Sequence, residues 1–164
     1  MVCKKVLDFL QRLTEYVLFL MVAAMVVIVF AQVIFRFALR ASLPWSEEAA
    51  RYIMVWISML GAGIGIRRKG HIGVEAVVML LPAVLKRAVA MLTTLVASGF
   101  FLGMVVYGIK ICRVVTAQES PAMEISMAIP YGSLVVGGAL MLLYSLEELL
   151  NLATSPMLSG EGER

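Results

Sequence analysis

The chain has 164 residues, of which 62% are apolar and only 15% charged, and its formal net charge is +3. Its mean hydropathy of +0.95 excludes a soluble globular domain, because a core of this size cannot bury so much apolar surface. The sequence therefore predicts an all-α integral membrane protein.

The amino-terminal 15 residues predict an amphipathic helix whose apolar side chains share one face. We expect this lead-in, residues 1–15, to lie at the inner membrane surface or to continue the first spanning helix. An uncharged run of 20 residues, 16–35, follows it. A helix needs about 20 apolar residues to cross a bilayer, so the first transmembrane helix is predicted at about residues 16–36.

The second apolar run, residues 52–66, is only 15 residues long. It reaches spanning length when it is extended to about residues 48–67, because basic side chains at both ends can snorkel to the headgroups. Ser46 is the predicted N-cap, with Glu47 and Glu48 in the first turn near the positive end of the helix dipole. Trp45 carries the amphipathic ring expected at headgroup level.

The stretch between the second and third helices is apolar but too short to span a membrane. We predict an interfacial helix at about residues 72–81, after which Pro82 opens the third helix, about residues 86–109. Residues 110–124 are expected to form an outer loop before the fourth helix, about residues 125–146. The prediction is one four-helix membrane domain, residues 16–150, followed by a disordered polar tail, residues 151–164.

The basic residues predict the orientation of these helices. The segments 1–15, 67–87 and 147–164 together hold nine lysines and arginines, whereas 36–51 and 110–124 hold five. Both termini are therefore expected in the cytoplasm. The positive charge is explained by topology, so nucleic acid is not an expected partner.

Small residues recur at helix-packing spacing in two of the helices. Gly61 and Gly65 form a GxxxG pair in the second helix, and Gly99 and Gly103 form another in the third. Such pairs let helix backbones approach closely in lipid. The favoured interpretation is packing within the four-helix unit, and the alternative is a docking face for another membrane subunit.

The predicted spans contain no ionisable residue at mid-depth, where a stand-alone ion-coupled transporter usually carries one. The single histidine, His71, cannot supply the two axial ligands of a haem subunit. No nucleophile stands in a catalytic pattern, so we predict no enzyme activity, no cofactor and no metal site. A small multidrug-type exporter and a membrane anchor of an enzyme complex remain as alternatives.

Charged residues gather at the two ends of the second helix. Arg36, Arg40, Glu48 and Arg51 are candidates for an outer patch that contacts a partner protein, although each also has a purely structural interpretation. At the inner end, Arg67 fits a topology anchor. His71 is either a hydrogen-bonding residue between subunits or an interfacial residue that touches lipid headgroups.

Taken together, five segments carry a resemblance to a known family. They read QVIFR (32–36), LPWSEEAARY (43–52), WISMLGAGIGIRRKGHIGVE (56–75), LP (81–82) and SPAMEISMAIPYG (120–132). This order resembles the small membrane subunit, of DctQ or SiaQ type, of tripartite ATP-independent periplasmic (TRAP) transporters. The matching positions are Arg36, Pro44, Trp45, Glu48, Arg51, Trp56, Gly61, Arg67, Gly70, His71, Pro121 and Pro130. Glu124 departs from the family pattern.

The resemblance implies a sodium-gradient-driven system for the uptake of a C4-dicarboxylate, sialic acid or a similar carboxylate. In such a system a periplasmic solute-binding protein delivers the substrate to a large elevator-type subunit in the bacterial inner membrane. The small subunit is then a scaffold bound stably to the large subunit and surrounded by lipid. The polar end of this chain predicts that it is a separate polypeptide and is not fused to the large subunit.

Overall fold

The computed structural model describes residues 2–68 and 82–154, which form four long helices. They are α1 (Val2–Phe37), α2 (Pro44–Arg67), α4 (Ala83–Val115) and α5 (Ala128–Thr154). All four are long and apolar enough to cross a membrane, which confirms the predicted number of spanning helices within these ranges. The predicted interfacial helix at 72–81, with Gly70 and His71 before it, lies outside the described residues.

The helices run past most of the predicted spans. The lead-in is continuous with the first helix, so α1 has 36 residues and is about 54 Å long. Helix α4 reaches Val115, and the outer connection therefore comprises residues 116–127 instead of the predicted 110–124. Residues 151–154 of the predicted tail form the last turn of α5.

The N-cap prediction for α2 is wrong. The cap residue is Leu43, and Pro44 is the first helical residue, where its missing N–H costs nothing. Ser46 lies one turn inside the helix, and its hydroxyl donates to the Leu43 carbonyl at 2.6 Å. The proline fixes the start of the helix earlier than the serine would have done.

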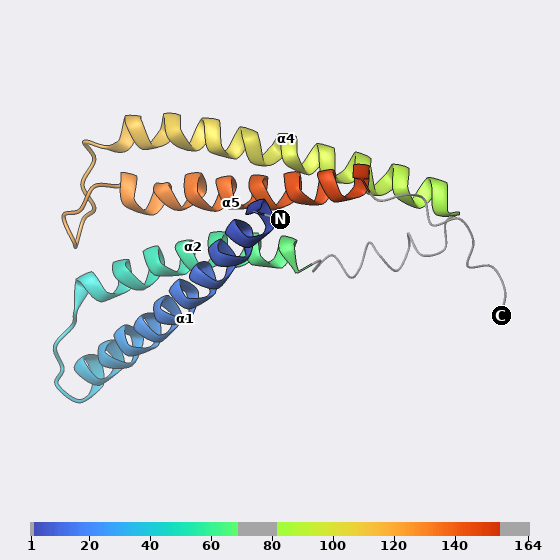
Figure 1. Cartoon of the computed structure of the whole chain (residues 1–164). Helices are drawn as coiled ribbons and strands as arrows, with labels where there is room; N and C mark the ends of the chain where they lie inside the picture. The colour runs from blue at the N-terminus through green and yellow to red at the C-terminus, as the bar shows by residue number, and fades with distance from the viewer. Residues whose placement is uncertain (1, 69–81, 155–164) are drawn as a thin grey trace, which may run out of the picture.

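Helix α5 is the centre of the molecule. It packs against α4 on one side and α2 on the other, so the three helices lie side by side in one layer (Figure 1). Helix α1 contacts α2 and crosses it obliquely, so that its amino-terminal end approaches α5. The most apolar segment of α5 is the most buried of the four, and that of α1 is not buried at all. Lipid or another membrane subunit must therefore cover most of α1 and the outer side of α4.

Glycines make the close contacts of this layer, but they are not those of the two GxxxG pairs. A side chain at Gly137 of α5 would stand 2.7 Å from the Met59 Cβ of α2, and one at Gly138 would stand 3.2 Å from Val105 of α4. By contrast, no atom of residues 2–68 and 82–154 lies within 4 Å of a Cβ built at any GxxxG glycine, namely Gly61, Gly65, Gly99 or Gly103. The favoured interpretation, packing of those pairs within the unit, is wrong.

The reason is the helical period. Gly61 and Gly65 each stand two residues from Gly63, and two residues turn a helix by about 200°. Gly63 faces α5, where its nearest neighbour is the Leu140 Cβ at 3.5 Å. The GxxxG pair of α2 therefore faces away from the layer. The same relation puts Gly99 and Gly103 on the outer side of α4, two residues from Phe101, whose carbonyl lies beside Gly138.

Replacing Gly137 with alanine should lower the free energy of unfolding by about 2 kcal/mol. The new Cβ would meet both the Cβ and the backbone oxygen of Met59, the latter at 3.1 Å, and a backbone atom cannot rotate away. The matched control is Gly61→Ala, which meets nothing within 4 Å and should not destabilise the isolated chain. Reversible unfolding in mixed detergent micelles compares the two, and equal stability would contradict the packing of α5 on α2.

Candidate functional site

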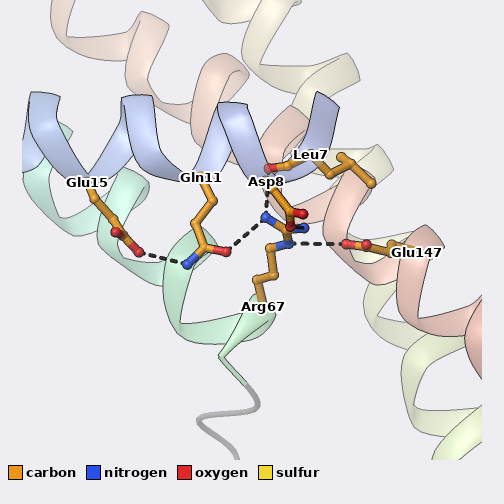
Figure 2. Close-up of polar contacts among 6 residues, drawn as sticks. All are labelled: Leu7, Asp8, Gln11, Glu15, Arg67 and Glu147. Atoms are coloured by element: carbon orange, nitrogen blue, oxygen red, sulfur yellow. Dashed lines mark hydrogen bonds and ion pairs between the residues drawn. The ribbon is translucent and has the colours of Figure 1, made fainter. Parts of the chain in front are cut away.

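Arg67, at the carboxyl end of α2, joins three helices (Figure 2). Its guanidinium donates to Glu147 of α5 at 3.1 Å and to Asp8 of α1 at 2.6 Å. One nitrogen also donates to the Leu7 carbonyl at 2.6 Å and the Gln11 side-chain oxygen at 2.8 Å. The Arg67 side chain is only 10% exposed, so these acceptors replace the water that it has lost.

Neighbouring side chains complete this inner cluster. The Tyr144 ring of α5 is almost fully buried and lies under the Arg67 guanidinium, 5.2 Å from ring centroid to Cζ. Glu15 accepts hydrogen bonds from Gln11 and from Arg68, both at 2.7 Å. Arg67 is thus far more than a topology anchor, because it fixes where α1 crosses the other two helices.

A second polar cluster lies at the opposite end of α2 and is organised by Glu48. One carboxylate oxygen accepts the backbone N–H groups of Ala122 and Met123 at 2.9 and 3.0 Å, and the other accepts the Tyr52 hydroxyl. Glu48 is 7% exposed. The carboxylate therefore faces inward, onto the connection between α4 and α5, and is not part of an exposed patch.

The connection that Glu48 holds is a small hairpin, residues 116–127. Its two arms meet in an antiparallel bridge between Glu119 and Ser126, with a hydrogen bond from the Ser120 N–H to the Ile125 carbonyl at 2.8 Å. Glu124 adopts φ 53° at the tip, a left-handed conformation that non-glycine residues seldom take. Glu124, which departs from the pattern of the resemblance, is therefore an exposed turn residue.

Trp56 of α2 and Pro130 of α5 lie at the base of the hairpin. The Trp56 indole donates to the Ile129 carbonyl at 3.2 Å, and its ring lies 3.7 Å from a side chain built at Gly132. Pro130 is buried in the first turn of α5, where no backbone N–H is needed. Trp56 therefore serves the contact between α2 and α5, and Pro130 starts α5 inside the molecule.

The remaining predicted outer residues are exposed. Arg36, Arg40 and Arg51 are solvent-facing, and within the described ranges none of them forms an ion pair. Trp45 is also exposed in the first turn of α2, and Pro121 is exposed on the hairpin. The structure thus separates Glu48, which acts within the chain, from the three arginines with which the sequence grouped it.

Sequence inspection missed two features of these clusters. It did not identify the acidic partners Asp8 and Glu147, which stand far apart in sequence and meet only through the crossing of α1 over α2. It also passed over Gly137 and Gly138, although this adjacent pair inside an apolar helix was a signal of close packing on two sides. In the described parts of the chain, no group of three His, Cys, Asp or Glu side chains is placed to hold a metal ion.

Comparison with known proteins identifies the family of this chain. Residues 25–155 match the model of the DctQ component of tripartite ATP-independent periplasmic transporters. Relatives include the C4-dicarboxylate TRAP transporter small permease protein DctQ of Vibrio cholerae, 27% identical over 57% of this chain and 40% of the relative. DctQ of Rhodobacter capsulatus is 27% identical over 61% and 45%, respectively.

The ectoine TRAP transporter small permease protein TeaB of Halomonas elongata is 28% identical over 78% of this chain and 70% of the relative. The match thus spans less than half the length of the two DctQ relatives and more than two thirds of TeaB. The family model covers most of the chain, including Glu48 and Arg67 of α2, whereas the α1 partners of Arg67 lie before the matched range. The chain therefore belongs to the DctQ family, the small permease component of TRAP transporters.

Proposed function

We propose that this chain is the scaffold subunit of a sodium-gradient-driven uptake system for organic acids, bound to a large elevator-type subunit. The observation that carries the proposal is the placement of charge. Each of the four helices contains a long uncharged run, at 16–35, 52–66, 88–109 and 128–146, and every charged side chain in the described ranges lies outside these runs. Such a membrane domain offers packing surfaces and no ion pathway, as a fixed frame requires.

The outer edge of α2 supports a docking surface for the large subunit. Gly61 and Gly65 lie on this edge with open space beside them, and Met54 and Ser58 continue the same stripe as exposed residues. Lipid provides no hydrophobic drive for helix association, so a smooth stripe on an unpaired edge favours a partner helix. The partner is the large TRAP subunit, because the family acts as a tripartite assembly.

Replacing Gly65 with leucine should reduce recovery of the large subunit at least about tenfold when the tagged chain is purified from native membranes. A Cβ at Gly65 meets no described atom of this chain within 4 Å, so the bulky side chain should separate the two backbones at the docking edge. The matched control is Gly103→Leu, the same substitution on the outer side of α4, where a Cβ likewise meets no described atom within 4 Å, and it should leave the recovery unchanged. If the wild-type chain recovers no large polytopic subunit, the proposed function fails; equal recovery with Gly65→Leu refutes only the docking edge.

The outer end of the molecule supports transient docking of a periplasmic solute-binding protein. It presents two poles, a basic one at Arg36, Arg40 and Arg51 and an acidic one on the hairpin at Glu119 and Glu124. Complementary charges steer association and set register more than they add affinity, which suits a partner that must also leave. Glu48 contributes indirectly, by holding the hairpin at a fixed place relative to the basic pole.

The orientation follows from the same assignment. The starts of α1 and α4 and the ends of α2 and α5 share one end of the molecule, and Arg67, Arg68, Lys86 and Arg87 gather there. Under the positive-inside rule this end faces the cytoplasm of the bacterial inner membrane. Arg87 also donates to the Leu152 carbonyl at 2.6 Å, where a cation stabilises the negative end of the α5 dipole.

The substrate class proposed is a carboxylate-bearing solute. The relatives that match this chain are named for C4-dicarboxylates and for ectoine. Since the described helices hold no buried charge that faces an open cavity, the solute is recognised by the binding protein and the large subunit.

A further inference from the structure

A shallow hollow lies on the surface of α1 near its amino-terminal end, lined by Arg12, Glu15, Tyr16 and Phe19. These positions repeat at the spacing of one helical stripe, so the hollow follows a single face of α1. It is separate from the docking edge of α2 and from the outer hairpin. Neither the family assignment nor the proposed scaffold role uses it.

One basic side chain in the lining of the hollow, Arg12, has no acidic partner of its own among the described residues. Arg12 is exposed, and within the described ranges its guanidinium forms no hydrogen bond or ion pair. Glu15 is already occupied by the Gln11 amide and by Arg68, whose side chain is 64% exposed. Lys5 stands seven residues before Arg12 and is also exposed, on the same stripe. The two carboxylates of this stripe, Asp8 and Glu15, are held by Arg67 and Arg68, so Arg12 remains available to an anion.

The hollow also crosses the boundary between headgroups and acyl chains. Tyr16 is 70% exposed and begins the uncharged run of α1, at the level where tyrosine rings favour the interface. Phe19 is 72% exposed and lies one turn deeper. From Arg12 to Phe19 the helix rises about 10 Å, the depth from a lipid phosphate to the upper acyl chain.

We propose that this hollow binds an anionic phospholipid of the cytoplasmic leaflet. Arg12 holds the phosphate by a charge-assisted hydrogen bond, the Tyr16 hydroxyl donates to a headgroup oxygen, and Phe19 packs on the acyl chain. A free phosphate ion would use only Arg12 and leave both rings without a partner. The inference rests on the proposed orientation, since the leaflet is the inner one only if this end faces the cytoplasm.

The test is native mass spectrometry of the full-length chain released from nanodiscs that contain equal amounts of phosphatidylglycerol and phosphatidylcholine. The wild-type chain should retain phosphatidylglycerol in preference to phosphatidylcholine. Arg12→Gln should lower that retention about fivefold, the effect of one basic side chain at an anionic surface. The matched control is Arg113→Gln, which removes an exposed positive charge from the opposite end of the molecule and should change nothing.

Further measurements distinguish a bound lipid from other possible occupants of the hollow. Retention that survives Arg12→Gln, or that inorganic phosphate at millimolar concentration displaces, would overturn the proposal. Loss of the lipid when the large subunit is present would show that the hollow is a subunit contact, which also overturns it. If Arg12→Gln fails to fold by circular dichroism, Phe19→Ala replaces it and should lower retention as well. Because these readouts need no transport, their failure leaves the proposed scaffold function standing.

Discussion

Replacing Arg67 with alanine should lower the free energy of unfolding by about 3 kcal/mol, since loss of one partner from a buried ion pair leaves an uncompensated charge. The Asp8 side chain is 51% exposed, so water can replace the lost guanidinium there. The Glu147 side chain is only 18% exposed, so its charge would stay uncompensated. Tyr144 would also lose the cation above its ring. The measurement is reversible unfolding of the purified chain in mixed micelles.

The structural consequence should be local to the crossing. Arg67 holds α1 through the Leu7 carbonyl, Gln11 and Asp8, so the amino-terminal end of α1 should move away from α5. Spin labels near the start of α1 and the end of α5 would then report a longer and broader distance distribution. Arg67→Lys keeps the charge but cannot reach acceptors on both helices with one ammonium, so we expect an intermediate loss.

Arg68 gives the matched control for this prediction. It is the next residue, it is mostly exposed, and it forms one ion pair, to Glu15 at 2.7 Å. An exposed pair contributes about 0–1 kcal/mol, so Arg68→Ala should be nearly neutral. Equal stabilities of the two alanine variants would refute the role of Arg67 in joining α1, α2 and α5.

Replacing Glu48 with alanine should release the outer hairpin. The Ala122 and Met123 N–H groups would lose the charged acceptor that they share, which costs about 3 kcal/mol in local stability. Amide hydrogen exchange at these two residues should accelerate about hundredfold, while α4 and α5 stay protected. The release of the hairpin should also lower uptake that depends on the periplasmic binding protein, because the acidic pole no longer has a fixed position.

Two variants control the Glu48 prediction. Glu48→Gln keeps an oxygen for the two N–H groups but loses the charge, so its effect should be smaller than that of alanine. Glu47→Ala removes the adjacent carboxylate, which is exposed and accepts one hydrogen bond from Gln32 at 3.1 Å, and should leave the hairpin intact. If hairpin exchange is as slow in Glu48→Ala as in Glu47→Ala, the anchoring role is wrong.

Local patterns were sufficient for the helices themselves. Uncharged runs of about spanning length predicted four helices, and Pro82 was correctly placed at the start of the third, where it is the N-cap of α4. The outer connection was displaced by several residues, because Lys110 and Arg113 read as loop residues although they occupy the last turns of α4. Charge marks the membrane boundary, but a helix can continue beyond it, so composition does not locate helix ends.

The two ends of α2 show where sequence reasoning stopped. Glu48 and the exposed arginines have the same local pattern, a charged residue near a helix end, and nothing in the sequence separates them. Only the return of the chain at Ala122 and Met123 shows that Glu48 faces inward. For the same reason the GxxxG pairs were assigned to internal packing, since spacing identifies a smooth stripe but does not say which neighbour faces it.

The sequence by itself determined that this protein spans a membrane with four helices, that its middle carries no charge, and that it resembles a TRAP small subunit. These properties depend on composition and on residue order along single helices, where the bilayer sets a length and a polarity that a sequence can be measured against. The tertiary structure alone decided that α5 is central, that Arg67 joins three helices, that Glu48 holds the hairpin and that the glycine pairs remain open. These facts depend on which helix faces which, and that is fixed by close packing between residues distant in sequence.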